Sequence, residues 1–306
     1  MSTAGQDILV LGATGRVGGA TLCALVEAGH APTALVRTPE RVDALPAPAP
    51  CRIGDLTDRA GLADSLQGID AMLLCSGHEP AMLDVQLGAL AAAEAAGVRR
   101  VVKISGSPAS SFEGTPSAVV AQHLEIEAAV RRSGLEFTFI RPNAFTQLLA
   151  GYAAEIAGGR LPLAFGTAAV SWVDVVDVGA VAAAALASKA PLPDVIDVTG
   201  PEALTGADLA AAVAAFTGSP VEYVALSDEQ SRERVRALGA PDWLVEHVGT
   251  IFALLRDRDG GRVTDAVEEW CGRPATSVAG VLAREASELG IRAALSAVNY
   301  EGGSNE

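Results

Sequence analysis

The feature that most constrains this chain is the alternation of short apolar segments with longer helical ones through its first half. The apolar segments lie at 7–12, 33–37, 51–56, 70–77, 100–106 and 136–142. Segments with helical spacing lie between most of them, at 16–29, 59–67, 81–97 and 117–133. Near-continuous apolar strands separated by helices are typical of a parallel sheet that is covered on both faces. The sequence therefore predicts an α/β fold with a doubly wound parallel sheet.

The pattern loosens in the second half of the chain. Strands are expected at 171–178, 194–200 and 221–226, and helices at 178–188, 204–218 and over most of the stretch to about residue 288. Two aspartates interrupt the valines of the first of these strands, and Asp177 is expected to cap the following helix rather than to form an acid pair with Asp174. Residues 289–306 are assigned to a polar tail, and its last part, VNYEGGSNE at 298–306, is predicted to be disordered.

Composition narrows the classes of function. The 306 residues carry a formal net charge of −15 at pH 7, which argues against a nucleic-acid-binding surface. The four cysteines are scattered, without the paired spacing of a zinc ribbon or a disulfide framework. The N-terminus lacks a basic leader, and no clean apolar span of about 20 residues occurs. We therefore expect a cytoplasmic monomer or homodimer that binds a small molecule, holds no metal, and binds neither nucleic acid nor membrane.

A glycine-rich turn follows the first predicted strand. The sequence LVLGATGRVGG places Gly12, Gly15 and Gly18 between that strand and the helix of 16–29. Glycine permits a positive φ, lets the backbone approach a ligand, and leaves N–H groups at the helix N-terminus free to bind a pyrophosphate. In this strand–turn–helix context, the spacing predicts a dinucleotide site in a Rossmann-type fold.

The residue at the end of the second strand indicates which dinucleotide binds. An acid at this place binds a free ribose 2′-hydroxyl, whereas an arginine suits a 2′-phosphate. The chain has Arg37 here, with Arg41 one turn later and Arg16 in the glycine loop. These charges favour NADP(H) over NAD(H) as the cofactor.

Motifs along nearly the whole chain resemble those of the NmrA-like family. They are GATGRVG, LVRTPER, GDLTDRAGLADSLQGID, SGLEFTFIRPNAF, WVDVVDVGAVAAAAL and TGPEALTGADLAAAVAAFTG, in this order between about residues 7 and 288. This family comprises atypical short-chain dehydrogenases and includes NADPH-dependent quinone oxidoreductases. Together with the strand and helix pattern, the resemblance implies a Rossmann domain of residues 1–150 plus 170–200. A smaller, mostly helical substrate lobe would comprise residues 151–169 and 201–288.

The resemblance also implies a set of site residues. The pyrophosphate would be bound by Gly12, Thr14, Gly15, Arg16, Val17 and Gly18, and the 2′-phosphate by Arg37. The adenine would lie beside Asp55 and Leu56, and the path to the nicotinamide ribose beside Cys75, Ser76 and Gly77. Ser105 and Gly106 would lie near the nicotinamide, and the substrate pocket would be lined by Ser107, Asn143, Phe145 and His78. Three structural alternatives stay open: a turn residue for Asp55, a buried packing residue for Cys75, and a solvent-facing loop position for His78.

One part of the usual short-chain dehydrogenase site is missing. Ordinary short-chain dehydrogenases carry a Tyr-x-x-x-Lys motif on the helix after the fifth strand. The tyrosine of this motif donates a proton to the carbonyl oxygen of the substrate. Here the corresponding positions fall on Val119 and His123, within SAVVAQHLEIEAAVRRSG at 117–134, and no tyrosine precedes Tyr152. The common alcohol–ketone mechanism is therefore in doubt.

His123 leaves two interpretations open. Helical spacing places it on one face with Val119, Val120, Ile126 and Val130. It is either a core histidine bonded to Glu127 or a carbonyl, or a pocket-facing group whose proton Glu127 supports from one turn away. His123 and Ser105 are our candidate catalytic residues. Tyr152 is a second possible proton donor, although helical packing is its favoured role.

These observations predict an NADPH-dependent oxidoreductase. It would reduce a small, apolar, electron-poor acceptor, a quinone or an enone or ketone metabolite, by direct hydride transfer without the Tyr/Lys pair. Two alternatives stay open. One is an NADP-sensing regulatory protein without turnover, and the other is a non-redox or rearranging enzyme of secondary metabolism on the same fold.

Overall fold

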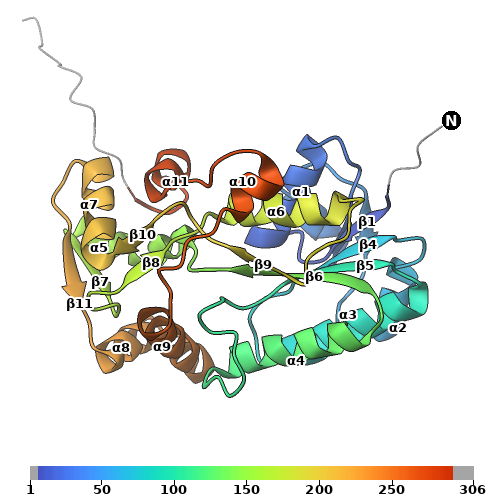
Figure 1. Cartoon of the computed structure of the whole chain (residues 1–306), viewed down its shortest axis with the longest axis horizontal. Helices are drawn as coiled ribbons and strands as arrows, with labels where there is room; N and C mark the ends of the chain where they lie inside the picture. Colours follow the sequence, from blue (N-terminus) through green and yellow to red (C-terminus); the bar gives the residue numbers. More distant parts are fainter. Residues whose placement is uncertain (1–5, 292–306) are drawn as a thin grey trace, which may run out of the picture.

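A parallel sheet with helices on both faces occupies the centre of the computed structural model, which describes residues 6–291 (Figure 1). Its strands are β1 (Ile8–Val10), β2 (Thr33–Val36), β3 (Cys51–Ile53), β4 (Ala71–Leu74), β5 (Arg100–Ile104), β6 (Glu136–Pro142) and β9 (Val195–Val198). They are ordered β3-β2-β1-β4-β5-β6-β9, and every neighbouring pair is parallel. The predicted doubly wound α/β fold is confirmed, and each of the six strands expected in the first half forms.

Alternate residues of each strand pack on two different helical layers. One layer is α1 (Arg16–Glu27), α6 (Val175–Ala187) and α10 (Ala266–Cys271). The other is α2 (Arg59–Ser65), α3 (Met82–Ala96) and α4 (Ala118–Arg132). In β5, Val102 and Ile104 join the first core, whereas Val101 joins the second. The same alternation places Lys103 on the side of α4.

A second core is built from the segments that follow β6 and β9. It contains two small sheets, one of β7 (Arg160–Leu163) with β11 (Glu222–Ala225) in parallel, the other of β8 (Ala169–Ser171) with β10 (Ala203–Thr205) in antiparallel. Around them lie the 3₁₀ helix η2 (Thr146–Tyr152), α5 (Ala153–Ala157), α7 (Gly206–Thr217), α8 (Asp228–Ala237), α9 (Asp242–Asp257) and α11 (Val278–Glu285). The predicted helices and the strand at 221–226 are confirmed, but β7 and β10 were not predicted. A further 3₁₀ helix, η1 (Pro39–Ala44), follows β2.

The strand expected at 171–178 is wrong. β8 ends at Ser171 and α6 begins at Val175, because the side chain of Asp174 accepts a hydrogen bond from the Val176 N–H and caps the helix. Asp177 therefore lies inside the first turn and is not the cap. Its buried carboxylate instead accepts hydrogen bonds from the Thr276 N–H at 2.6 Å and the Thr276 hydroxyl at 3.1 Å.

The tail assigned to 289–306 starts with packed residues, because Leu289 and Ile291 are each 3% exposed and belong to the second core. The segment predicted to be disordered, 298–306, lies outside the described residues. Between residues 6 and 291, no helix has the length and apolar character needed to cross a membrane.

Candidate functional site

The glycine turn brings the start of α1 against the end of β4. Gly12 has φ +67°, and a Cβ at this residue would lie 2.9 Å from the Cys75 carbonyl oxygen. A Cβ at Gly18 would lie 2.3 Å from the Gly12 carbonyl oxygen, so neither position accepts a larger residue. Gly15 occupies the N-cap of α1 without a side-chain hydrogen bond, and Thr14 and Val17 are partly exposed beside it. The turn thus presents backbone N–H groups at the carboxyl edge of the sheet, as a pyrophosphate site requires.

Two arginines flank this turn where the adenosine end of a dinucleotide would lie. Arg37 is exposed, and its Nε lies 3.4 Å from Asp55 Oδ2. Arg41 donates to the Thr14 hydroxyl at 3.4 Å. The Thr57 N–H and hydroxyl, and more weakly Arg37, lower the pKa of Asp55, which stays ionised beside the arginine. Leu56 is half-buried next to this pair.

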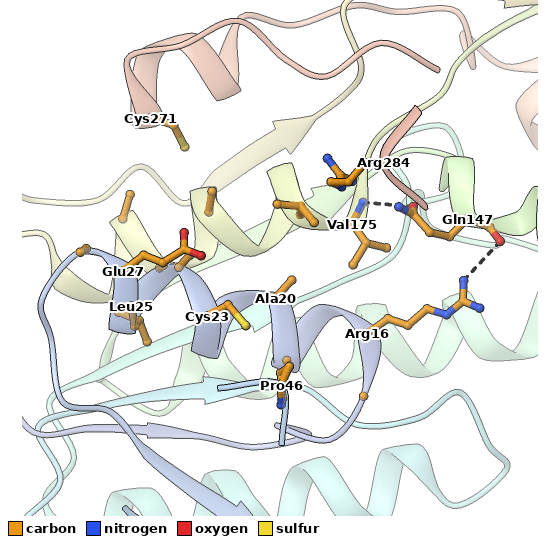
Figure 2. A pocket seen from close by; sticks show the side chains of 18 of the residues that line it. Arg16, Ala20, Cys23, Leu25, Glu27, Pro46, Gln147, Val175, Cys271 and Arg284 are labelled. Atoms are coloured by element: carbon orange, nitrogen blue, oxygen red, sulfur yellow. Dashed lines mark hydrogen bonds between the residues drawn. The ribbon is translucent and has the colours of Figure 1, made fainter. Parts of the chain in front are cut away.

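Arg16 points away from Arg37 and Arg41. Its guanidinium donates to the Gln147 carbonyl oxygen at 3.2 Å, as Figure 2 shows. The positive charges beside the expected 2′-phosphate position would therefore be those of Arg37 and Arg41, whereas Arg16 bridges α1 and η2.

The segment after β4 carries one packed thiol and two polar positions. Cys75 packs against the first core, and burial raises its pKa to about 11, so the thiol stays neutral. The Ser76 hydroxyl accepts a hydrogen bond from Gln86 Nε2 at 2.9 Å. Gly77 and His78 are exposed at the edge of the sheet.

His123 lies at the centre of a row of basic side chains. It is 3% exposed on the buried face of α4, which contains all of the residues predicted to share that face. Its Nδ1 lies 3.0 Å from Lys103 Nζ, and its Nε2 lies 3.2 Å from His78 Nε2. Its Cδ2 lies 3.6 Å from the position of a Cβ on Gly106. Burial, Lys103 and the neighbouring imidazoles lower the pKa of His123 well below its usual value, so the ring is neutral at pH 7.

The sequence suggested Glu127 as a partner of His123, but the structure gives this carboxylate other partners. The carboxylate accepts two hydrogen bonds from Arg141, at 3.0 and 2.6 Å, and a third from the Ser105 hydroxyl at 2.6 Å. Ser105 is 4% exposed and is fixed by this contact. Glu127 therefore anchors the end of β5 to α4 and β6, and among the described residues the hydrogen-bond partners of the His123 ring are Lys103 and His78.

The residues expected to line the substrate pocket lie in two different settings. Asn143 is buried and donates both amide hydrogens within the protein, to the Ser171 hydroxyl and the Gly260 carbonyl, each at 2.7 Å. Its Oδ1 accepts from the Ser107 hydroxyl at 3.0 Å. Phe145 packs against the first core. The structure thus ties Asn143 and Ser107 to the junction of β6 and β8, whereas His78 stays at the open edge.

Two basic residues of this region were missed by sequence reasoning. Lys103 is fully buried, yet it stands in a strand that was read only as apolar. A usable signal was present, since Lys103 and Lys189 are the only lysines among the 22 basic residues. His247 on α9 lies 5.6 Å from the His78 ring, and its Nδ1 lies 3.1 Å from the hydroxyl of Ser117, the N-cap of α4. No sequence motif connects these two segments.

Tyr152 is placed for packing. It is 7% exposed in the second core, and the Arg234 guanidinium lies 4.0 Å from its ring centroid. Burial raises the pKa of its phenol to about 12. The favoured role predicted for this tyrosine fits its surroundings.

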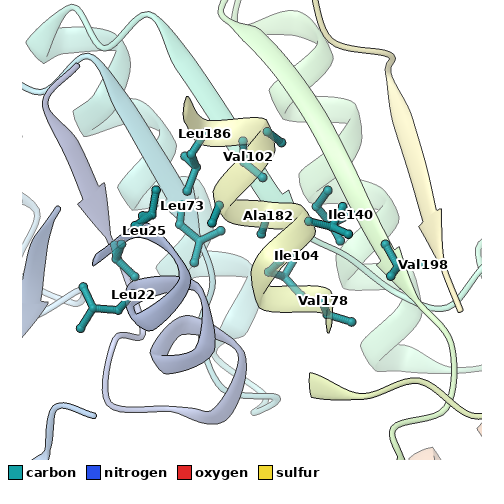
Figure 3. Packing of buried hydrophobic residues seen from close by; sticks show 14 of the residues in the cluster. Leu22, Leu25, Leu73, Val102, Ile104, Ile140, Val178, Ala182, Leu186 and Val198 are labelled. Atoms are coloured by element: carbon teal, nitrogen blue, oxygen red, sulfur yellow. The ribbon is translucent and has the colours of Figure 1, made fainter. Parts of the chain in front are cut away.

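A groove of about 970 Å³ runs along the outer side of α1, between that helix and α6, α10 and α11 (Figure 2). Alanines of α1 and α6 line it together with larger side chains such as Trp270 and Arg284, and it meets the glycine turn only at Thr14, Gly15 and Arg16. The inner faces of α1 and α6 form the core shown in Figure 3. The basic row of Lys103, His123 and His78 lies on the opposite side of the sheet. Within the described part of the chain, no group of three or more His, Cys, Asp or Glu side chains is arranged to hold a metal ion.

Comparison with known proteins identifies the nucleotide-binding half. Residues 12–189 match the model of a family described as NAD(P)H-binding. The chain is 33% identical over 285 residues to NAD(P)H azoreductase from Xenophilus azovorans, with 92% of this chain and 99% of the relative covered. It is 35% identical over 273 residues to (4-alkanoyl-5-oxo-2,5-dihydrofuran-3-yl)methyl phosphate reductase from Streptomyces griseus, covering 88% of this chain and 94% of that relative.

A solved structure has the same fold over almost the whole chain. The NADPH-dependent quinone oxidoreductase from Escherichia coli superposes with a TM-score of 0.80 at 25% identity, covering 90% of this chain and 98% of that one. These matches cover both the glycine turn and the helical lobe. The chain belongs to the NAD(P)H-binding family, within the NmrA-like group of atypical short-chain dehydrogenases that its motifs resemble.

Proposed function

We propose that this protein is an NADPH-dependent reductase of a small, apolar, electron-poor acceptor such as a quinone, an azo compound or an enone. The observation that carries the proposal is that the glycine turn and the histidine pair His78–His123 both lie at the end of β4. The glycine turn lies directly against the end of β4, and the exposed His78 follows that same strand and contacts His123. A nicotinamide bound along this edge would lie beside basic groups that are able to pass a proton.

The relatives support this reaction class. One is an azoreductase, a second reduces a butenolide phosphate, and the structural relative is a quinone oxidoreductase. The acceptors in these names share a conjugated, electron-poor π-system. Hydride transfer to such a system gives a stabilised anion, so the reaction needs less acid assistance than ketone reduction does. That requirement agrees with the absence of a tyrosine from α4.

Different parts of the site would bind the cofactor and keep water from its nicotinamide. Bound NADPH supplies the hydride. The glycine turn would bind the pyrophosphate through backbone N–H groups, with Arg37 and Arg41 binding the 2′-phosphate. The buried β5–α4 junction, held by Glu127, Ser105 and Arg141, would keep water from the nicotinamide face.

The test is NADPH consumption with a panel of quinones, azo dyes and enones. We expect turnover with at least one class, with one NADPH oxidised for each quinone or enone reduced and two for each azo bond cleaved to amines. Tight NADP binding without turnover would overturn the proposal and favour a sensor. Product formation without net NADPH oxidation would overturn it in favour of a non-redox enzyme.

Arg37 provides the test of cofactor preference. In Arg37→Glu the introduced carboxylate repels the 2′-phosphate and removes its ligand, so the KM for NADPH should rise by about 10- to 100-fold while that for NADH changes little. Arg236→Glu makes the same charge change at an exposed site in α8 and serves as the control. An equal effect of the two substitutions would show that Arg37 does not read the 2′-phosphate.

A further inference from the structure

Lys103 is a buried ammonium group without a carboxylate in contact. Its Nζ donates to the Ile104 carbonyl at 2.9 Å and lies 3.0 Å from His123 Nδ1. Within residues 6–291 no salt bridge includes this nitrogen. The nearby acid on α4, Glu127, is already occupied by Arg141 and Ser105. Lys103 therefore holds its positive charge with little compensation.

The groups that face Lys103 come from the end of β4 and from α4. They are the Cys75 thiol after β4, and His123 and Glu127 on α4, and His78 lies beyond His123 in the segment after β4. Burial lowers the pKa of Lys103 to about 7, against smaller opposing effects of Glu127 and Cys75. At neutral pH this amine thus holds a proton that it can readily release.

A continuous row of nitrogen atoms connects this buried amine with the surface. Lys103 Nζ contacts His123 Nδ1, and His123 Nε2 contacts Nε2 of the exposed His78. An ammonium only donates, so when Lys103 is charged His123 accepts at Nδ1 and carries its hydrogen on Nε2. That hydrogen points at His78, whose own hydrogen is then on Nδ1.

We propose that Lys103 stores the proton consumed in the reduction and supplies it to the reduced acceptor through His123 and His78. The inference rests on the reductase function proposed above. After hydride reduction the acceptor would carry a negative charge. His78 gives its Nδ1 proton to that anion and takes one from His123 Nε2, while His123 Nδ1 takes one from Lys103. Lys103 becomes a neutral amine, and after product release a solvent proton returns to it along the same row.

The chemistry explains why a lysine stands here in an arginine-rich protein. Arginine is charged at every physiological pH and cannot release a proton, whereas a buried lysine can. Lys189, the other lysine, is exposed and lies far from the row in sequence. It is the matched control.

The first measurement does not depend on turnover. In protein labelled at the lysine ε-carbons, NMR should show one lysine, absent from Lys103→Met, that titrates with a midpoint near pH 7. The imidazole signals of His123 and His78 should shift with the same midpoint, and this shift should disappear in Lys103→Met but persist in Lys189→Met. A Lys103 midpoint above about pH 9 would overturn the proposal, whatever the activity.

The second measurement is the pH dependence of the rate. With an enone, whose enolate needs a proton, kcat should fall as pH rises above about 7, because deprotonated Lys103 has none to give. Lys103→Met and Lys103→Arg should both lower kcat at pH 6 by about 10- to 100-fold and remove this pH dependence, with an unchanged Kd for NADPH. Quinone reduction should change less, because its hydroquinone anion can leave and be protonated in solvent.

Each result has a distinct meaning. Full activity of Lys103→Arg would show that a fixed positive charge suffices and would overturn the proton-storage role. An unchanged pH profile of kcat in Lys103→Met would also overturn the proton-storage role. If no acceptor is reduced by the wild type, the reductase proposal fails, while the NMR titration still decides whether the three residues share one proton.

Discussion

At the scale of single residues, burial decides which groups of the site hold a proton. His123 has lost its basicity because it is enclosed beside a cation and two other imidazoles. It can pass a proton between neighbours but does not hold a second proton at neutral pH. The pattern of α4 placed this histidine on the apolar face of the helix and left open whether it faces the core or a pocket. It did not reveal Lys103, because a strand pattern records apolar positions and a single cation within it has no period.

The depressed basicity of Lys103 has a measurable cost in stability. The unfolded chain binds a proton at this lysine up to about pH 10.4, whereas the folded protein releases it near pH 7. Stability should therefore rise with pH above 7, since the unfolded state binds more protons there. Between pH 7 and about pH 8.5 the free energy of unfolding of the wild type should increase by about 1–2 kcal/mol relative to Lys103→Met, measured by urea unfolding. Parallel pH dependences in the two proteins would show that Lys103 keeps its ordinary basicity.

At the scale of secondary-structure elements, a helix cap explains why the strand predicted at 171–178 is wrong. The segment around Val175 has the β-branched composition of a strand, but Asp174 caps it as a helix. The core-facing helices were predictable because their apolar residues recur with helical spacing. The first six strands were predictable because they alternate regularly with those helices, although β1 and β3 have only three residues each. The strands β7, β8 and β10 are equally short and lie outside that alternation.

Asp177 shows how one anchor holds two distant elements. Its buried carboxylate accepts hydrogen bonds from Thr276 and forms an ion pair with Arg273, whose Nη1 lies 2.7 Å from Asp177 Oδ1. Asp177 therefore fixes the segment between α10 and α11 onto α6. Asp177→Ala leaves the Thr276 N–H without its partner, and we expect a loss of about 2–3 kcal/mol in the free energy of unfolding. Asp43→Ala, at an exposed position, should change it by less than about 0.5 kcal/mol. A similar small loss for both variants would mean that this segment is held by packing alone.

At the scale of the whole molecule, α9 joins the second core to the Rossmann sheet. Trp243, near the start of this helix, packs on the core beneath α4, while Phe252 and Leu255 belong to the second core. His247 contacts the α4 N-cap between them. Sequence analysis divided the chain into a Rossmann domain and a helical lobe with similar bounds. The contacts between these two parts could not be predicted, because they connect residues more than a hundred positions apart.

This junction predicts sensitivity to acid. Burial lowers the pKa of His247 to about 4, so the unfolded state binds more protons between pH 4 and 6.5 and stability falls as pH drops through that range. Between about pH 6.5 and about pH 4.5 we expect His247 to account for a loss of about 2 kcal/mol, with His123 adding to it. In His247→Gln this part of the loss should be absent, whereas His30→Gln should retain it. Equal acid sensitivity of all three proteins in urea unfolding would contradict the assignment.

The pairing of the small strands also has a consequence for synthesis of the chain. The seven strands of the central sheet are complete once β9 has been made, at Val198. By then β7 and β8 have been made, but their partners, β11 and β10, follow only at Glu222–Ala225 and Ala203–Thr205. A nascent chain that pauses between these points exposes two unpaired strand edges beside a complete central sheet. Premature termination near residue 200 should therefore yield a product that aggregates, although its large sheet is complete.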